Sequence, residues 1–263
     1  MRTRKLMLMI SAVLVLPVAL LIAAQQPDPQ PPLPVAEQDL NVVAPPGGEL
    51  DCDPAIVPRW QTIEGRNYVE WAEAWWQWLV AFPPDENPVL DPTGQYAGQG
   101  QSPPSYAGPM YFLTGTFGGG PVVRDITIAS DKYILVTPLN CWWDTYPGLW
   151  NPLNLPDPLS IQDLRAICAW FMDRGSVSCT IDGREIRGLR YSRLRTSVFS
   201  LNFDPEFATF YGYDTPYLRT AVGDGWFVIL RPLDPGQHVI HFTGEIPDIQ
   251  FVVDVTYNIT VVP

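Results

Sequence analysis

The strand pattern that decides the fold class is clearest in residues 225–262, which read GWFVILRPLDPGQHVIHFTGEIPDIQFVVDVTYNITVV. Three segments within it, Gly225–Arg231, Gln237–Gly244 and Phe251–Val262, alternate with a period of two. This period predicts strands that bury one face and leave the other outside the core. Pro232–Gly236 joins the first two segments with the residue types that a hairpin turn favours, so we expect these two strands to pair.

More strands are expected upstream, because short apolar segments alternate there with turn residues. They cover residues 110–116, 122–128, 132–139, 176–181, 184–189 and 198–203. Phe117–Pro121 and the pair Asp182-Gly183 are typical hairpin connections. Many short strands separated by turns predict a mainly β fold. We expect an antiparallel two-sheet β-sandwich of jelly-roll or immunoglobulin-like type, with two α-helices and long loops.

The first helix is predicted over residues 66–82, where aromatic and aliphatic side chains recur at helical spacing and two prolines follow. Apolar residues cover most of its circumference, so it is expected to be largely buried. Ser160 is the expected N-cap of the second helix, with Asp163 in its first turn and Gly175 as the left-handed residue that ends it. Long loops are expected at residues 85–110, 140–159 and 204–221.

Residues 1–24 are expected to be a secretory signal. Basic residues at positions 2, 4 and 5 precede the apolar segment Leu6–Ala24, which ends in small residues. An uncleaved membrane anchor is the alternative, because the segment is close to the length that spans a bilayer. Residues 25–58 hold nine of the 29 prolines and are expected to form an extended linker, which leaves 59–263 as a single β-sandwich domain.

The composition and the net charge indicate which kinds of partner the chain can bind. The chain is 46% hydrophobic, which is enough for a sizeable core, and its formal net charge is −12. An acidic chain is repelled by phosphate backbones, so we expect no nucleic-acid partner. With the N-terminal segment, this composition predicts a secreted or cell-envelope protein that meets a membrane only through residues 1–24. The oligomeric state stays open.

Four cysteines suit the oxidising compartment that export implies. We expect Cys168 to pair with Cys179, because a helix and the next strand would bring them together, and Cys52 to pair with Cys141 as the remainder. Four buried free thiols are the alternative. No zinc or EF-hand pattern is present, so no metal site or cofactor is predicted, although calcium is compatible with so many acidic residues.

An ordered series of short motifs runs through the expected domain. They are WAEAWWQW at 71–78, NPVLD at 87–91, GPMYFLTG at 108–115, IDG at 181–183 and PLDPGQH at 232–238. In this order they resemble a family of uncharacterised exported bacterial proteins. The resemblance implies export and a single domain. The family has no known activity, so the resemblance implies no function.

Paired carboxylates are the candidate for catalysis. Glu70 and Glu73 lie three positions apart on the one polar strip of the first helix, so their Cβ atoms would be about 5–6 Å apart. Partial burial would raise the pKa of one carboxyl and leave an acid beside a base, as a glycoside hydrolase or lyase needs. Asp91 is expected to join them from a loop. The alternative is a solvated strip, or pairing with arginines of the sheet.

Three further side chains are candidates to act with this pair. Asp144 is a second loop carboxylate that would join it, and Arg124 and Lys132 are expected cationic stabilisers. A hydrolase triad is not expected, because His238 and His241 lie three apart in a predicted strand and point to opposite faces.

Aromatic loop residues are the candidate for binding. Trp142, Trp143, Tyr146 and Trp150 lie in one proline-broken loop, and such rings can stack on the apolar faces of sugars. The alternative is that they anchor the loop to the sheet. The favoured hypothesis is therefore a non-catalytic protein that binds a glycan or another cell-envelope component. A carbohydrate-active enzyme and a structural envelope protein are the other two.

Overall fold

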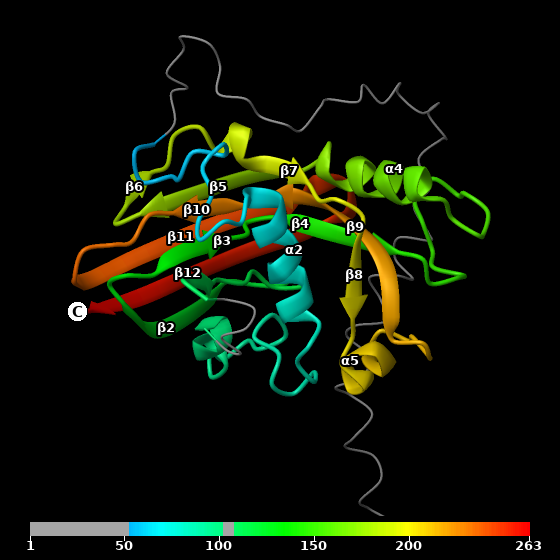
Figure 1. The fold of residues 1–263 in the computed structure, drawn as a ribbon, viewed down its shortest axis with the longest axis horizontal. Coiled ribbons are helices and arrows are strands. Elements are labelled where there is room, and N and C mark those ends of the chain that lie inside the picture. Colours follow the sequence, from blue (N-terminus) through cyan, green and yellow to red (C-terminus); the bar gives the residue numbers. More distant parts are fainter. Residues whose placement is uncertain (1–52, 102–107) are drawn as a thin grey trace, which may run out of the picture. The chain divides into compact units, whose positions relative to one another are not determined.

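The computed structural model describes residues 53–101 and 108–263. Their secondary structure is mainly β, as predicted, and comprises twelve strands and three α-helices in this part of the chain (Figure 1). The strands are β1 (Met110–Phe112), β2 (Val122–Ala129), β3 (Tyr133–Val136), β4 (Asn140–Asp144), β5 (Ser176–Ile181), β6 (Arg184–Glu185), β7 (Arg193–Arg195), β8 (Phe199–Asn202), β9 (Leu218–Trp226), β10 (Val228–Leu230), β11 (Gly236–Ile246) and β12 (Phe251–Val262). The α-helices are α2 (Tyr68–Leu79), α4 (Ile161–Met172) and α5 (Pro205–Phe210). Short 3₁₀ helices are η1 (Ala97–Gln101), η2 (Leu189–Ser192) and η3 (Pro247–Ile249).

These strands form three sheets. The largest has the order β2-β12-β11-β5-β6, the second β1-β3-β10, and the third β4-β9-β7 with β8 also paired to β9. The chain passes directly from one of the two smaller sheets to the other at two places. Strand β3 of the second sheet is followed by β4 of the third, and β9 of the third is followed by β10 of the second. Two strand pairs, β1 with β3 and β2 with β12, are parallel, so the expectation of a wholly antiparallel fold is wrong.

The main β core lies between the five-stranded sheet and the β1-β3-β10 sheet. Ile134 and Val136 of β3 share one buried cluster with Phe242 of β11 and Val255 of β12. Leu135, between them, belongs to a second cluster on the other side, because successive side chains of a strand point to opposite faces. The three-stranded sheet is therefore buried on both faces.

Helix α2 covers that second face, and Figure 1 shows it lying across the strands. Its four tryptophans are each no more than 2% exposed, which agrees with the prediction of a largely buried helix. The side chain of Trp75 donates through Nε1 to the carbonyl of Leu113 at 3.0 Å, so even its polar atom is used inside the core. The helix ends at Leu79, earlier than the predicted residue 82.

Two successive tryptophans of strand β4 point to opposite faces of the β4-β9-β7 sheet. Trp142 packs towards α2, with its ring centroid 4.9 Å from that of Trp76. Trp143 packs towards α4, where it stacks on Phe171 at 5.4 Å. Helix α4 thus covers the opposite face of this sheet from α2.

The predicted start of α4 is confirmed, and its predicted end is wrong. Ser160 and Asp163 form a capping box, as the sequence indicates. The C-cap Asp173 is right-handed, and Gly175 has no positive φ. Glycine provides space there instead, because a Cβ atom at position 175 would lie 2.5 Å from Cδ2 of Leu139.

One predicted hairpin is confirmed and two are wrong. Asp182-Gly183 joins β5 to β6 with φ values of 52° and 77°. The expected partners on either side of residues 117–121 pair instead with β3 and β12. Likewise β10 and β11, which flank Pro232–Gly236, lie in different sheets. The long hairpin is formed by β11 and β12, from the pair Gly236 and Val261 to the pair Ile246 and Phe251.

Two of the expected loops contain a strand or an α-helix that was not predicted there. Strand β4 occupies the start of residues 140–159, and α5 lies within residues 204–221. Strand β7, which pairs with β9 through Arg193–Arg195, was not predicted. These three elements belong to the third sheet or lie next to it, so much of that sheet was not predicted from the sequence.

The last residues of the expected linker are packed on the domain. Ile56 and Val57 are buried, and the carboxylate of Asp53 is buried in an ion pair with Arg184. Residues 1–52, which include the expected signal and the rest of the linker, lie outside the described residues. No helix among the described residues is long and apolar enough to cross a membrane.

Candidate functional site

The predicted catalytic pair is divided between two structural tasks. Glu70 accepts a hydrogen bond from the backbone nitrogen of Asn67 at 2.8 Å and completes the capping box of α2. Glu73 accepts one from the backbone nitrogen of Ser197 at 2.8 Å. Burial raises the pKa of the Glu73 carboxyl, and the charge of Glu70 adds to this, although the hydrogen bonds from Ser197 act against it.

Asp91 and Arg124, expected near that pair, organise the loop between α2 and β1. Asp91 accepts hydrogen bonds from Thr93 and from the backbone nitrogen of Tyr96 at 2.8 Å. The guanidinium of Arg124 is fully buried and donates to the carbonyl oxygens of Pro88 and Thr114 at 2.8 and 2.6 Å. Within the described residues, no hydrogen bond or ion pair joins Glu73 to either side chain.

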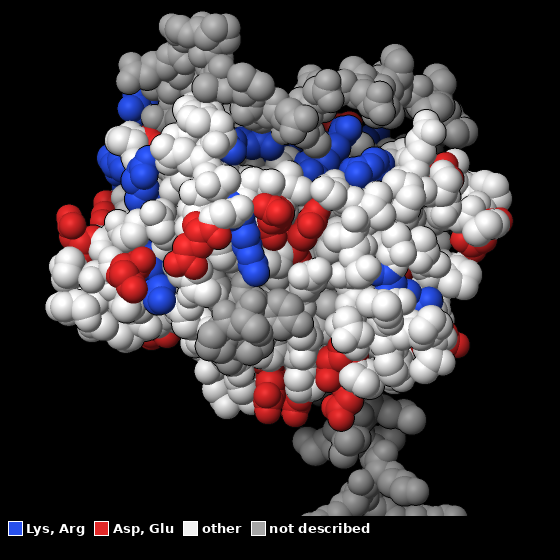
Figure 2. Space-filling view, viewed as in Figure 1, with Lys and Arg blue, Asp and Glu red and all other residues white. Residues whose placement is uncertain are grey.

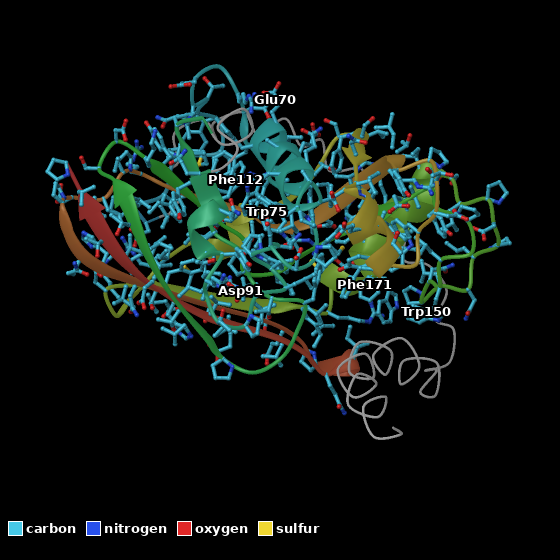
Figure 3. The ribbon with its side chains drawn as sticks, turned by 90° about the horizontal axis from the view of Figure 1, so that it is seen from below. Glu70, Trp75, Asp91, Phe112, Trp150 and Phe171 are labelled. Carbon is cyan, nitrogen blue, oxygen red and sulfur yellow. The ribbon has the colours of Figure 1, made fainter. Side chains whose placement is uncertain are left out.

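The expected aromatic surface is not formed by one group of rings. Trp142 and Trp143 point to opposite faces of the sheet, and Tyr146 stacks on Tyr213 at 4.6 Å. Trp150 is the most exposed of the predicted set, at 38%. Figure 3 shows Glu70, Asp91 and Trp150 at three separate places. The predicted catalytic and binding residues therefore do not converge.

Asp144 is the centre of a buried polar cluster that the sequence did not predict. Its carboxylate accepts hydrogen bonds from Trp142 Nε1 at 3.1 Å, from the Tyr213 hydroxyl at 2.9 Å and from the Tyr146 backbone nitrogen at 2.8 Å. Burial raises the pKa of Asp144, and these hydrogen bonds with the charge of Arg219 oppose the rise. The cluster holds the loop after β4 against the chain around Tyr213, which is a structural role.

The remaining predicted cation and the histidines have local partners. Lys132 lies 3.8 Å from the carboxylate of its neighbour Asp131 in the turn between β2 and β3. His238 and His241 each contact a different aspartate, Asp182 at 2.8 Å and Asp254 at 2.9 Å. Among residues 53–101 and 108–263, no group of three or more His, Cys, Asp or Glu side chains could hold a metal ion.

The predicted Cys168–Cys179 disulfide is not formed in the structure. Both residues are free thiols, and they lie in different apolar clusters. Cys52 lies outside the described residues, so the expected Cys52–Cys141 pair does too.

A group of arginines stands out against this background. Residues 184–195 hold five arginines in twelve positions, and this density is the signal in the sequence. Three of the five, Arg190, Arg193 and Arg195, belong to the group. Five arginines make their contacts around η2, β7 and the N-terminal half of α4. We call these residues the arginine strip: Arg59, Arg165, Arg190, Arg193 and Arg195.

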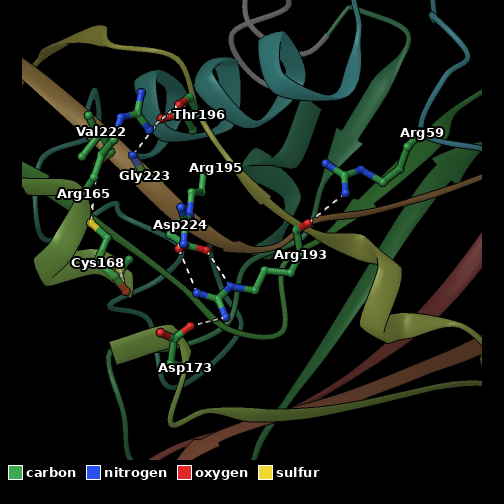
Figure 4. Close-up of polar contacts among 11 residues, drawn as sticks. Arg59, Arg165, Cys168, Asp173, Arg193, Arg195, Thr196, Val222, Gly223 and Asp224 are labelled. Carbon is green, nitrogen blue, oxygen red and sulfur yellow. Dashed lines mark hydrogen bonds and ion pairs between the residues drawn. The ribbon is translucent and has the colours of Figure 1, made fainter. Parts of the chain in front are cut away.

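Asp224 of β9 anchors the middle of the strip. Arg193 binds its carboxylate with two hydrogen bonds, from Nε at 2.9 Å and from Nη2 at 3.0 Å, and reaches Asp173 at 2.7 Å (Figure 4). Arg195 shares Asp224 through a longer contact of 3.3 Å. Burial alone would lower the pKa of Arg193, but its hydrogen bonds and charge interactions with the two aspartates raise it. One buried carboxylate thus holds two guanidinium groups.

The other members of the strip contact neutral groups. Arg59 donates to the carbonyl oxygens of Tyr191 and Arg193 at 3.2 and 3.0 Å. Arg165 donates to that of Thr196 at 3.1 Å, and the guanidinium of Arg190 lies 4.4 Å from the ring centroid of Tyr191. Carbonyl oxygens and rings leave the guanidinium charge uncompensated.

The strip therefore keeps an excess of positive charge. Among the described residues its five arginines form ion pairs with two carboxylates, so five minus two leaves about +3, in a chain whose formal charge is −12. Figure 2 shows Lys and Arg atoms gathered along the upper edge of this face, over β6, β7 and α4, with acidic atoms below them. Fixed guanidinium groups with spare charge are suited to binding anions.

A scan against protein-family models, a search of curated proteins and a search of solved structures each found no match.

Proposed function

We propose that this protein is an exported, non-catalytic binding protein of the cell envelope whose ligand is an anionic glycan held by the arginine strip. The observation that carries the proposal is the convergence of arginines from four segments on one edge with too few carboxylates to neutralise them. Expected export through residues 1–24 supports the envelope as the place where the ligand is met.

The form of the strip supports a ligand with a few anionic groups. A planar guanidinium can bind a carboxylate, sulfate or phosphate group through two parallel hydrogen bonds. Tyr191 holds the guanidinium of Arg190 in place, because that group lies over its ring in a cation–π contact. The overall charge of −12 repels long polyanions, which favours a short acidic segment of glycan over an extended nucleic acid.

We infer that the sheets of this protein pack in the way the sequence predicts, as a two-sheet sandwich. The buried cluster that the five-stranded and three-stranded sheets share supports this. Its strand order departs from jelly-roll and immunoglobulin-like types at the parallel pairs β1–β3 and β2–β12.

A carbohydrate-active enzyme is the second candidate function, and one observation favours it. The raised pKa of Glu73 is the property of a general acid. The use of Glu70 as a helix cap weakens it, because an enzyme of this class needs a second free carboxylate beside the first. The third candidate, a structural envelope protein, draws support from the buried positions of the aromatic side chains in α2.

Affinity chromatography tests the proposal. The full-length protein is applied at low salt to immobilised heparin oligosaccharides, which are short sulfated glycans, and to neutral dextran. We expect retention on heparin alone, and elution at a lower salt concentration for the variant that combines Arg190→Gln with Arg195→Gln. Lys132→Gln, which removes one positive charge in the turn between β2 and β3, is the matched control and should elute with the wild type.

Two results would overturn the proposal. One is the absence of retention on heparin at low salt. The other is the same shift per removed charge in the control and in the double variant, which would mean that net charge and not the strip determines retention.

A further inference from the structure

Cys141 and Cys168 face each other across the interface between β4 and α4. Cys141 Sγ lies 3.7 Å from the carbonyl oxygen of Cys168 and donates to it. Cys168 Sγ donates to the carbonyl oxygen of Val222, on the neighbouring strand β9, at 3.9 Å (Figure 4). In the register of β4 and β9, Cys141 pairs with Asp224 and Trp143 with Val222, so these side chains share the face that α4 covers.

The environment of the two thiols is apolar and close-packed. Cys168 is 1% exposed and belongs to the cluster between α4 and the third sheet, against which Cys141 packs. Burial raises the pKa of Cys141, and its interaction with the Cys168 thiol and the charge of Asp224 raise it further. The two thiols are thus direct neighbours inside the fold, unlike Cys179, which lies in the cluster between the five-stranded and three-stranded sheets.

We propose that Cys141 and Cys168 form a disulfide bond when the chain folds in an oxidising compartment. The oxidant is a disulfide, carried by an oxidoreductase or by oxidised glutathione. The thiolate of one cysteine attacks the oxidant disulfide, and one reduced thiol of the oxidant leaves. The second cysteine then attacks this mixed disulfide and releases the other thiol. In sum, two protein thiols lose two electrons and two protons, and one disulfide is reduced to two thiols.

The environment also determines when the bond can form. The sulfur atoms have to approach to the ~2.05 Å of a disulfide by rotation about the Cα–Cβ bonds. Because only the thiolate is nucleophilic, a thiol with a raised pKa reacts slowly once it is enclosed. Oxidation therefore belongs to folding, before α4 is closed over β4. The resulting bond is structural and stays out of exchange in the folded protein.

The bond would fix the strand that carries Trp142 and Trp143 to helix α4. The two cysteines are 27 positions apart, and the loop between them includes residues 145–159. Closing a loop of this length restricts the unfolded chain, so the midpoint of thermal unfolding should rise by roughly 5–10 °C over that of the reduced protein. The inference is independent of the proposed glycan binding, which uses no cysteine.

The experiment refolds the full-length protein in a mixture of reduced and oxidised glutathione and then alkylates the free thiols. Mass spectrometry of the proteolytic digest, without reduction, should give a peptide pair linked through Cys141 and Cys168 and an alkylated Cys179. The Cys168→Ser variant should lose this linked peptide and the 5–10 °C increase in the unfolding midpoint. Cys179→Ser, in which another buried thiol is changed, should keep the linked peptide.

Three results would overturn the inference. The first is full alkylation of Cys141 and Cys168 after oxidative refolding. The second is a peptide that links Cys141 to Cys52. The third is a linkage between Cys168 and Cys179. If Cys168→Ser fails to fold, comparison of wild-type protein before and after reduction gives the same unfolding shift, and the peptide map of the wild type stands by itself.

Discussion

Arg124 is expected to contribute strongly to stability. Its guanidinium is fully buried and donates to the carbonyl oxygens of Pro88, Asp91, Thr114 and Gly115. Arg124→Met would leave these acceptors without a donor, so we expect a loss of about 3–5 kcal/mol in the free energy of unfolding. Denaturant unfolding measures this loss. The variant Lys132→Gln changes a partly exposed turn residue with one local ion pair, so it should change by no more than about 0.5 kcal/mol. A loss of similar size in both variants would contradict the account.

The sequence predicted a cationic stabiliser at Arg124, and the structure shows a buried side chain bound to backbone carbonyl oxygens. The residue type and the predicted strand position do not say which groups surround an arginine side chain. A role beside candidate carboxylates therefore agrees with the sequence alone. The structure surrounds Arg124 with backbone carbonyl oxygens of residues far apart in the chain. Such contacts depend on tertiary packing, which no local pattern of residue types reveals. The same holds for Asp144, whose partners include Tyr213 from a different loop.

Glu73 is expected to make stability depend on pH. Its pKa is raised above the usual 4.5 by burial, so the folded state binds a proton more tightly than the unfolded chain. The folded state therefore loses stability as the pH rises from about 4.5 through the higher folded pKa. Glu73→Gln keeps an acceptor for Ser197 and removes this loss.

Thermal unfolding of the wild type and of Glu73→Gln over pH 4–8 checks this prediction. The stability of the variant relative to the wild type should increase with pH above about 4.5 and then level off. The control Glu86→Gln, at an exposed loop position, should follow the wild type at every pH. A relative stability of Glu73→Gln that stays constant across the range would show that the carboxyl is not perturbed.

At the scale of elements, the stability of helix α2 distinguishes two roles for Glu70, as part of the capping box or as a catalytic carboxylate. If the carboxylate serves as a cap, Glu70→Ala should destabilise the protein by about 1 kcal/mol, and Asn67→Ala should cost about the same. Because the two side chains act together, the double variant should lose less than the sum. Chemical denaturation of the three variants tests this. Full stability of Glu70→Ala would leave the carboxylate free for another role.

Helices were easier to predict than strand partners for a physical reason. The period of apolar residues and the caps are local, so α2 and the start of α4 follow from the sequence. Strand pairing joins distant residues, and a glycine-rich or proline-rich turn such as Phe117–Pro121 fits a hairpin as well as a crossover. Gly225 illustrates the missing information. Its φ is 154°, and a Cβ atom there would lie 2.5 Å from Cα of Asn140, a contact that only the paired strands create.

At the scale of the whole chain, the sequence predicted a mainly β body, and the structure agrees. Export was predicted from residues 1–24, which lie outside the described residues, and it stays a prediction. The candidate site was not predicted, because a chain with an acidic composition gives no overall sign of a local group of arginines. Arg190, Arg193 and Arg195 of the strip lie in an arginine-rich stretch of the sequence, residues 184–195. Only the fold places Arg59 and Arg165 beside them.

The salt dependence of binding is the most direct test of the central claim that the arginine strip holds an anionic ligand. The dissociation constant for a heparin oligosaccharide is measured at several sodium chloride concentrations. Each guanidinium that contacts an anionic group should contribute about one unit to the slope of log K against log salt. The variant with both Arg190→Gln and Arg195→Gln should therefore lose about two units of slope, while Lys132→Gln keeps the wild-type value. An unchanged slope in the double variant would contradict the account.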